Sequence, residues 1–102
     1  MVLNSPKVRH LRYEQLRKSL TETVEKWPHF YEHKIIGKNA ETFKEGLKNF
    51  EQQFPRMNKK SSHLSKNGTY LSQTYEVMAR DVDEIISLWV ASEEIPDFVT
   101  VL

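Results

Sequence analysis

The chain has 102 residues, 38% of them hydrophobic and 28% charged, which is enough to build one folded domain and unlike a disordered protein. It contains no cysteine, and this excludes disulfides, thiolate catalysis and cysteine-ligated metal centres. Fifteen basic and 14 acidic side chains nearly cancel, but the basic excess lies in residues 1–66 and the acidic excess in residues 67–102, a polarity that could steer a partner.

The first segment of the chain is predicted to be an amphipathic helix over residues 8–26. Four apolar side chains recur at helical spacing, and Pro28 ends the run because the residue before a proline avoids the helical conformation. This helix needs a surface on which to pack. The sequence therefore divides into an N-terminal helical extension, residues 1–26, and a domain, residues 27–102. The apolar stripe of the helix consists of Leu16, Leu20, Val24 and Trp27.

The rest of the chain alternates between strand and helix patterns. Residues 29–37 form a predicted strand that contains two adjacent isoleucines, and Asn39 is the expected N-cap of a helix over residues 40–54. Proline follows that helix and stops it. A weak strand, a stronger strand, a helix that begins near Asp81 or Asp83, and a short last strand complete the chain; the three strands cover residues 57–65, 70–79 and 98–102.

Asn67-Gly68 marks a turn between the second and third predicted strands. This dipeptide tolerates positive φ angles and is typical of two-residue hairpins. A turn centred there places Ser65 opposite Tyr70. Continuing the same register places Lys59 opposite Glu76 and Met57 opposite Met78.

From residue 29 onward the predicted order is β-α-β-β-α-β. This order indicates an α+β fold of the ferredoxin-like βαββαβ sandwich type, with one antiparallel sheet and two helices on one face. Right-handed crossovers place the strands in the spatial order 4-1-3-2. The polar second strand then lies at an edge of the sheet, where lysines discourage further pairing.

Neither a catalytic nor a metal site is indicated by the pattern of polar residues. No nucleophile elbow precedes Ser61, Ser62 or Ser72, although His63 lies close to all three. His29 and His33 lie four positions apart, and on a strand this spacing places their side chains too far from each other to bind one metal ion. The chain has three glycines and no phosphate-binding loop. We therefore expect a protein that is not an enzyme and has no cofactor or metal.

Several short stretches together resemble the YbeD-like family of small uncharacterised bacterial proteins. They are Trp27-Pro28, the strand end Lys34-Ile35-Ile36-Gly37, the turn with Gly68, Tyr70 and Ser72, and the final Val101-Leu102. The resemblance covers residues 27–102 and implies a ferredoxin-like fold similar to ACT regulatory domains, with no established activity. Two positions depart from the family: Lys66 stands in place of a second serine, and Gln73 in place of an aliphatic residue.

The sheet face away from the two helices is the surface for which the sequence predicts a function. It is expected to be partly apolar and to need a cover, which could be a second copy, another protein or the N-terminal helix. Whether that helix covers its own sheet or exchanges between copies stays open at this point. The predicted interaction face consists of Lys34, Ile36, Met57, Lys59, Tyr70, Ser72, Met78, Val99 and Val101.

Three functions follow from these patterns. The first is a non-catalytic regulatory or protein-interaction module that acts through this face, by partner binding or self-association. The second is a sensor of amino acids or small carboxylates, similar to ACT domains, with Gly37, Lys38 and Asn39 as the ligand loop beside a helix N-terminus. The third is an RNA-binding module, because aromatic side chains such as Tyr70 on an open sheet can stack on bases. The N-terminal sequence lacks a signal-peptide core and no run is long enough to span a membrane, so we expect a cytoplasmic protein.

Overall fold

The computed structural model describes the backbone of residues 6–102 and the side chains from residue 11 onward, so residues 1–5 of the predicted extension lie outside the described part. The α+β class is confirmed, and each predicted element is present. The elements are α1 (Pro6–Thr23), β1 (His29–Lys38), α2 (Glu41–Gln53), β2 (Asn58–Leu64), β3 (Tyr70–Ala79), α3 (Val82–Glu93) and β4 (Phe98–Val101).

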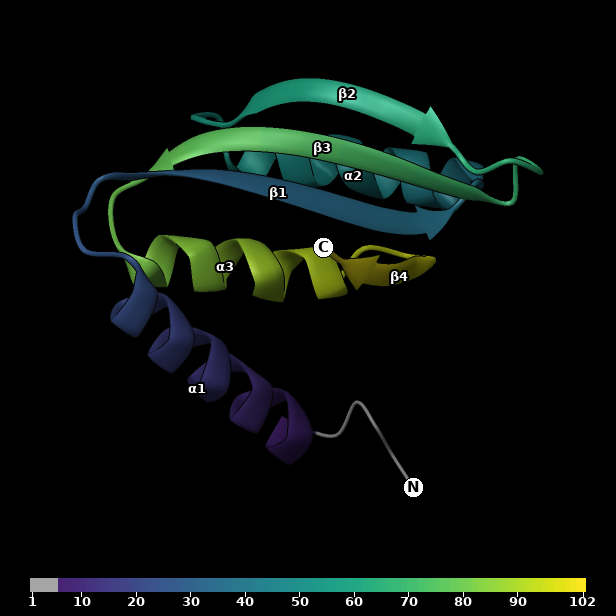
Figure 1. Cartoon of the computed structure of the whole chain (residues 1–102). Helices are drawn as coiled ribbons and strands as arrows, with labels where there is room; N and C mark the ends of the chain where they lie inside the picture. Colours follow the sequence, from purple (N-terminus) through teal and green to yellow (C-terminus); the bar gives the residue numbers. More distant parts are fainter. Residues whose placement is uncertain (1–5) are drawn as a thin grey trace.

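The four strands form one antiparallel sheet whose order is β2-β3-β1-β4. Read from the β4 edge, this is the order 4-1-3-2. The long central strands β1 and β3 pair over ten residues, from His29 opposite Ala79 to Lys38 opposite Tyr70. The polar strand β2 is exposed along its whole length and lies at one edge, beside β3 (Figure 1).

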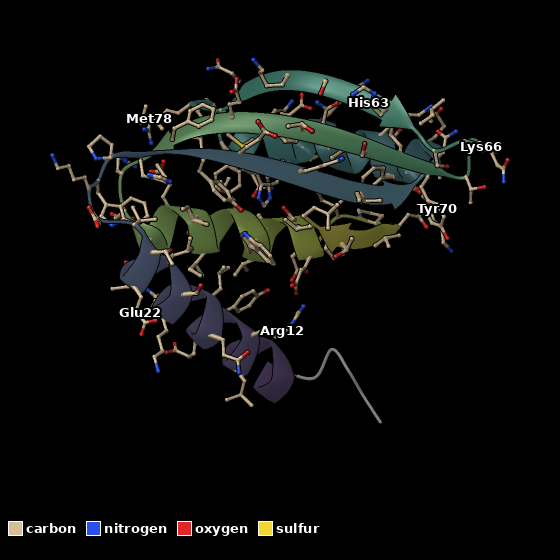
Figure 2. All side chains as sticks on the ribbon, in the orientation of Figure 1. Arg12, Glu22, His63, Lys66, Tyr70 and Met78 are labelled. Carbon is tan, nitrogen blue, oxygen red and sulfur yellow. The ribbon has the colours of Figure 1, made fainter. Side chains whose placement is uncertain are left out.

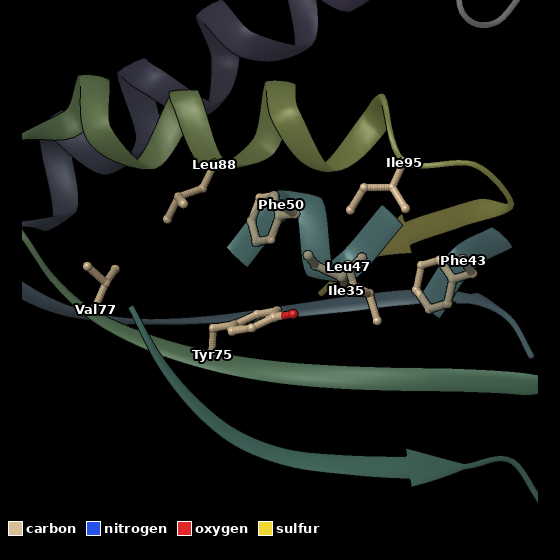
Figure 3. Close-up of a cluster of buried hydrophobic side chains, with 8 residues drawn as sticks. All are labelled: Ile35, Phe43, Leu47, Phe50, Tyr75, Val77, Leu88 and Ile95. Atoms are coloured by element: carbon tan, nitrogen blue, oxygen red, sulfur yellow. The ribbon is translucent and has the colours of Figure 1, made fainter. Parts of the chain in front are cut away.

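The core lies between one face of the sheet and the two helices α2 and α3. Ile35 and Tyr75 from the central strands meet Phe50 of α2 and Leu88 of α3, and each of these four side chains is at most 1% exposed (Figure 3). Odd-numbered residues of β1 and β3 therefore face the helices, since successive strand residues point to opposite faces. Helix α3 uses Leu88 for this purpose and leaves Val90 40% exposed.

Helix α1 packs on α3 and not on the sheet. Figure 1 shows α1 beyond α3, on the side of that helix away from the strands. Ion pairs between described side chains join the helices: Arg12 to Glu93, with 2.8 Å between nitrogen and oxygen, and Arg17 to Asp83. The basic excess of the early chain thus meets part of the acidic excess of the late chain inside one molecule. Three covers were considered for the open sheet face, and α1 of the same chain does not cover it in this structure.

The ends of two helices differ from the sequence prediction. Helix α1 ends at Thr23, so Val24 and Trp27 lie in the segment that leads to β1, while Leu16 and Leu20 lie in the helix; all four are half-buried. The N-cap of α2 is Ala40 rather than Asn39. The side-chain amide of Asn39 instead donates to the carbonyl of Gly68, at 2.9 Å.

A bulge in β2 changes the predicted hairpin register. His63 pairs with Ser72 and Ser61 with Thr74, as a turn at Asn67-Gly68 requires. The extra residue Lys60 then shifts the register, so that Lys59 pairs with Tyr75 and not with Glu76. In the turn Gly68 alone has a positive φ, 72°, a conformation that suits glycine.

Candidate functional site

We call the sheet face opposite α2 and α3 the open face. Its residues on β1 and β3 are the even-numbered ones, because the odd-numbered ones enter the core. The elements of residues 6–102 leave this face uncovered, since α2 and α3 pack on the other face and α1 packs on α3 (Figure 1). The open face consists of Phe30, Glu32, Lys34, Ile36, Lys60, Ser61, His63, Tyr70, Ser72, Thr74, Glu76, Met78, Val99 and Thr100.

Three predicted members of this face lie on the helix side instead. Val101 pairs with Ile35 and is only 7% exposed, because a bulge in β4 places Val99 and Thr100 together on the open face. The Lys60 bulge turns Lys59 toward α2, where its ammonium lies 3.6 Å from Glu51. Met57 precedes β2 and packs against the core. The other predicted members, Lys34, Ile36, Tyr70, Ser72, Met78 and Val99, do lie on the open face.

A hollow of about 400 Å³ lies at one end of the open face and is lined by residues of all four strands. Ile36 and Val99 provide apolar walls, Lys34 provides an ammonium group, and Ser72 and Thr100 provide hydroxyl groups. Lys34 makes no ion pair with any described residue, although it is half-buried. The hollow thus combines a free positive charge with an apolar wall, which is the chemistry that a small carboxylate with an apolar body requires.

The centre of the open face carries two carboxylates side by side. Glu32 of β1 pairs directly with Glu76 of β3, and like charges in such positions repel each other. Lys60, from the bulge of β2, relieves part of this repulsion with its ammonium 2.8 Å from Glu76, and both carboxylates raise the pKa of Lys60. Glu32 itself has no ion-pair partner among the described residues.

Apolar side chains lie at both ends of the face, on either side of these charges. Phe30 and Met78 are cross-strand neighbours, and each is 50% exposed. Tyr70 and Val99, at the other end, are 44% and 46% exposed. Figure 2 shows Met78 and Tyr70 at opposite ends of β3, with His63 near Tyr70. Exposed apolar groups gathered on one face indicate a surface that binds something.

The predicted ligand loop, Gly37 to Asn39, makes contacts that stabilise the fold. A Cβ on Gly37 would lie 2.3 Å from the ring of Phe43, so this position has room only for glycine. The backbone amide of Lys38 bonds to Asp97, and that of Asn39 bonds to Thr69. The carboxylate of Asp97 also accepts a hydrogen bond from Thr42 in the first turn of α2, where a helix favours negative charge. The chain's own carboxylate therefore lies beside the place expected for a ligand carboxylate.

A chain of hydrogen bonds crosses the core between β1 and α3. Trp89 donates to the hydroxyl of Tyr31 at 2.7 Å, and that hydroxyl lies 3.1 Å from Nδ1 of His33. At the other end Ser92 donates to the carbonyl of Leu88, so its oxygen accepts from Nε2 of His33 at 2.8 Å. The carbonyl of Leu88 can only accept, so the one hydroxyl proton of Ser92 points to it and Nε2 of His33 donates to Ser92. Burial keeps His33 neutral, so its Nδ1 carries no proton and accepts from the hydroxyl of Tyr31.

This arrangement explains the state of His33 and Ser92 and shows what they do. Both residues are fully buried, and burial lowers the pKa of His33 to about 4. The ring of His33 also stacks on Phe50, with 6.0 Å between ring centres. The hydroxyl of Ser92 donates its hydrogen bond to a backbone carbonyl, so no base is in position to activate this hydroxyl as a nucleophile. The network joins α3 to the sheet, and nothing in the sequence pattern had indicated it.

Ser72 and His63, the serine–histidine pair considered from the sequence, also make a contact that belongs to the fold. The hydroxyl of Ser72 lies 3.4 Å from the backbone carbonyl of His63 and makes no bond to its imidazole. Across the side chains of residues 11–102, no three His, Asp or Glu residues gather as a metal site would require. Within the described helices, none has the length and apolar character needed to cross a membrane.

A comparison with protein families identifies the chain at the level of its family. The profile of a family described as protein of unknown function (DUF493) matches residues 22–102. The chain belongs to this family. No curated protein and no solved structure matches it. The matched residues include the whole sheet and hence every residue of the open face.

Sequence reasoning had left several open-face residues out of the interaction face, among them Phe30 and Lys60. Strict alternation along β1 would have found Phe30, because it has the same parity as Lys34 and Ile36. Lys60 had no such signal. Its position depends on the bulge, which a count of residues from the turn does not reveal.

Proposed function

We propose that this protein is a non-catalytic interaction module that binds a partner protein through the open face. One observation carries this proposal: exposed apolar side chains at both ends of the face flank free charges, and no described element covers them. Exposed apolar side chains that gather on one face of a folded domain indicate a binding surface. The buried position of Ser92 and the backbone bond of Ser72 agree with a role that involves no nucleophile.

We further propose that residues 27–102 form a ferredoxin-like domain of the YbeD-like type. The βαββαβ order, the antiparallel sheet and the two helices on one face support this assignment.

The experiment compares two apolar-to-lysine variants. Ile36→Lys places a charge in the wall of the hollow on the open face, and Val90→Lys places the same charge on α3, away from that face. Each variant is immobilised and used to capture proteins from a lysate of the source cells, after circular dichroism has shown that it folds. We expect Ile36→Lys to lose the captured partner and Val90→Lys to retain it. Equal capture by the two variants and the unchanged chain would refute the proposal.

A second function is favoured by the hollow beside Lys34, namely the sensing of a small carboxylate. The site differs from the loop at Gly37, which is filled by Phe43. The ligand class is a monocarboxylate with a short apolar body, whose charge would be met by the free ammonium of Lys34. Thermal-shift screening of aliphatic and aromatic amino and keto acids tests this function, with Lys34→Met as the control. A compound that stabilises both proteins equally would contradict binding at this hollow.

RNA binding stays the third proposal, and the open face gives it less support. Tyr70 is exposed as that function requires, but Glu32 and Glu76 at the centre of the face would repel phosphate groups. Salt-dependent binding to mixed-sequence oligonucleotides would support the RNA-binding function.

A further inference from the structure

The open-face residues of β1 form a stripe with an unusual order of chemistry. Phe30, Glu32, Lys34 and Ile36 follow one another at two-residue spacing on the same face. The order along the strand is apolar, acidic, basic, apolar. Reversing the strand leaves the apolar ends in place and exchanges the two charges.

This stripe is complementary to a reversed copy of itself. If two copies pack face to face about a two-fold axis near His33, Glu32 of one copy lies opposite Lys34 of the other, and the reverse pair follows by symmetry. Phe30 of each copy then lies over Ile36 of the other. No other arrangement of two identical stripes matches both charges and both apolar ends.

The neighbouring strand supports the same arrangement. Met78 lies beside Phe30, and Ser72 lies beside Ile36. The two-fold operation brings the Phe30–Met78 end of one copy to the hollow of the other, whose walls include Ile36 and Val99. An exposed aromatic–thioether pair thus meets an apolar hollow, at both ends of the interface.

The charges at the centre need such a partner. Glu32 lies directly opposite Glu76 in the sheet, and of the two only Glu76 has an ion pair with a described residue, namely Lys60. Lys34 has none among the described residues. In the paired arrangement each free charge faces an opposite one across the interface, which selects this register over others.

We propose that the partner of the open face is a second copy of this chain, bound as a two-fold symmetric dimer through the β1 stripe. This inference rests on the proposed function and names the partner. A standard interface buries about 800 Å² on each side, a little over a tenth of the 6938 Å² surface of the chain. Packed sheets lie about 10 Å apart and cross at about 30°, so the central pairs of the stripe stay closest together.

Charge exchange tests the register. In Glu32→Lys the stripe carries two lysines, and in Lys34→Glu it carries two glutamates, so each variant meets like charges when it pairs with itself. Sedimentation at about 0.1 mM, well above a micromolar Kd, should show the unchanged chain as a dimer and each variant with at least about tenfold weaker self-association. An equal mixture of the two variants should form a heterodimer, because both cross-interface pairs are then opposite in charge.

The control is Glu45→Lys, which makes the same charge change on the exposed side of α2 and should leave the dimer intact. A monomeric unchanged chain, a dimer insensitive to either exchange, or a mixture that does not associate would each overturn the proposed dimer. The capture experiment distinguishes failure of the proposed dimer from failure of the proposed interaction module. If Ile36→Lys still loses a captured protein while the chain is monomeric, the open face binds a different protein; if Ile36→Lys also captures normally, the interaction module itself fails.

Discussion

Burial of His33 predicts that the protein loses stability in mildly acidic solution. The folded protein holds this imidazole neutral with a pKa of about 4, lowered by burial from its ordinary value of 6.5. The unfolded chain gains a proton at that imidazole below about pH 6.5, while the folded chain does not until about pH 4. Protons therefore favour the unfolded state within this window. The stability is fully present above pH 6.5 and falls as the pH decreases toward 4.

The size of the effect follows from the difference of 2.5 pKa units, that is 6.5 less 4. The complete window corresponds to about 3 kcal/mol. Between about pH 7.5 and about pH 5 the expected loss in the free energy of unfolding is about 2 kcal/mol. Stopping at pH 5 limits the contribution of Glu84: partial burial raises its pKa, but the hydrogen bonds that it accepts from Arg80 and Arg56 and their positive charges together lower it.

Urea denaturation followed by tryptophan fluorescence measures this loss. A fall of about 2 kcal/mol moves the midpoint by about 1–2 M urea for a domain of this size. The control is His33→Gln, which keeps an amide able to donate to Ser92 but has no proton to gain in this range. We expect the variant to be less stable at pH 7.5 and to show a much smaller change on acidification.

Two results would refute the reasoning. One is a midpoint in the unchanged chain that does not move between these pH values. The other is a variant that loses as much stability as the unchanged chain. If the variant does not fold, nitrogen-15 NMR of the imidazole gives the answer directly, because a His33 ring that is protonated at pH 5.5 would contradict the hydrogen-bond directions assigned here.

Three further predictions concern particular contacts. Gly37→Ala should cost several kcal/mol in urea denaturation, since the new Cβ meets the Phe43 ring at 2.3 Å; a cost below about 1 kcal/mol would show that the ring moves freely. Asp81→Ala should cost about 1 kcal/mol, because the Asp81 side chain caps α3 by accepting from the backbone amide of Glu84, and Asp81→Asn should recover most of it. Raising the salt concentration from about 0.05 M to about 1 M should speed amide hydrogen exchange in α1 more than in α3, because exposed ion pairs such as that of Arg17 help to hold α1 in place; equal acceleration in both helices would contradict this.

The order of elements was predictable because it depends on local periodicity. Ile35-Ile36 and the alternation along residues 70–79 indicate strands, and the spacing of Phe43, Leu47 and Phe50 indicates a helix. The structure places strands and a helix at these positions. Asp81, one of the two caps proposed for the last helix, is the N-cap.

The interaction face was predictable only where strand parity was uninterrupted. Lys34, Ile36, Tyr70, Ser72 and Met78 lie in strands that pair without a shift, so counting by two places them correctly. A bulge adds one residue to a strand, so counting by two beyond it assigns each residue to the opposite face of the sheet. For this reason Lys59 and Val101 were assigned to the wrong face.

The succession of helices and strands and the antiparallel hairpin at Asn67-Gly68 could be read from the sequence, since each depends on residues close together in the chain, and the composition alone rules out cysteine chemistry. The folded structure was needed to find the position of α1, the bulges that redirect β2 and β4, and the neutral state of His33 between Tyr31 and Ser92. These features depend on groups brought together from distant parts of the chain, and local patterns carry no information about such meetings. The absence of ion pairs for Glu32 and Lys34 among the described residues is of the same kind, because it depends on which distant groups fold next to them.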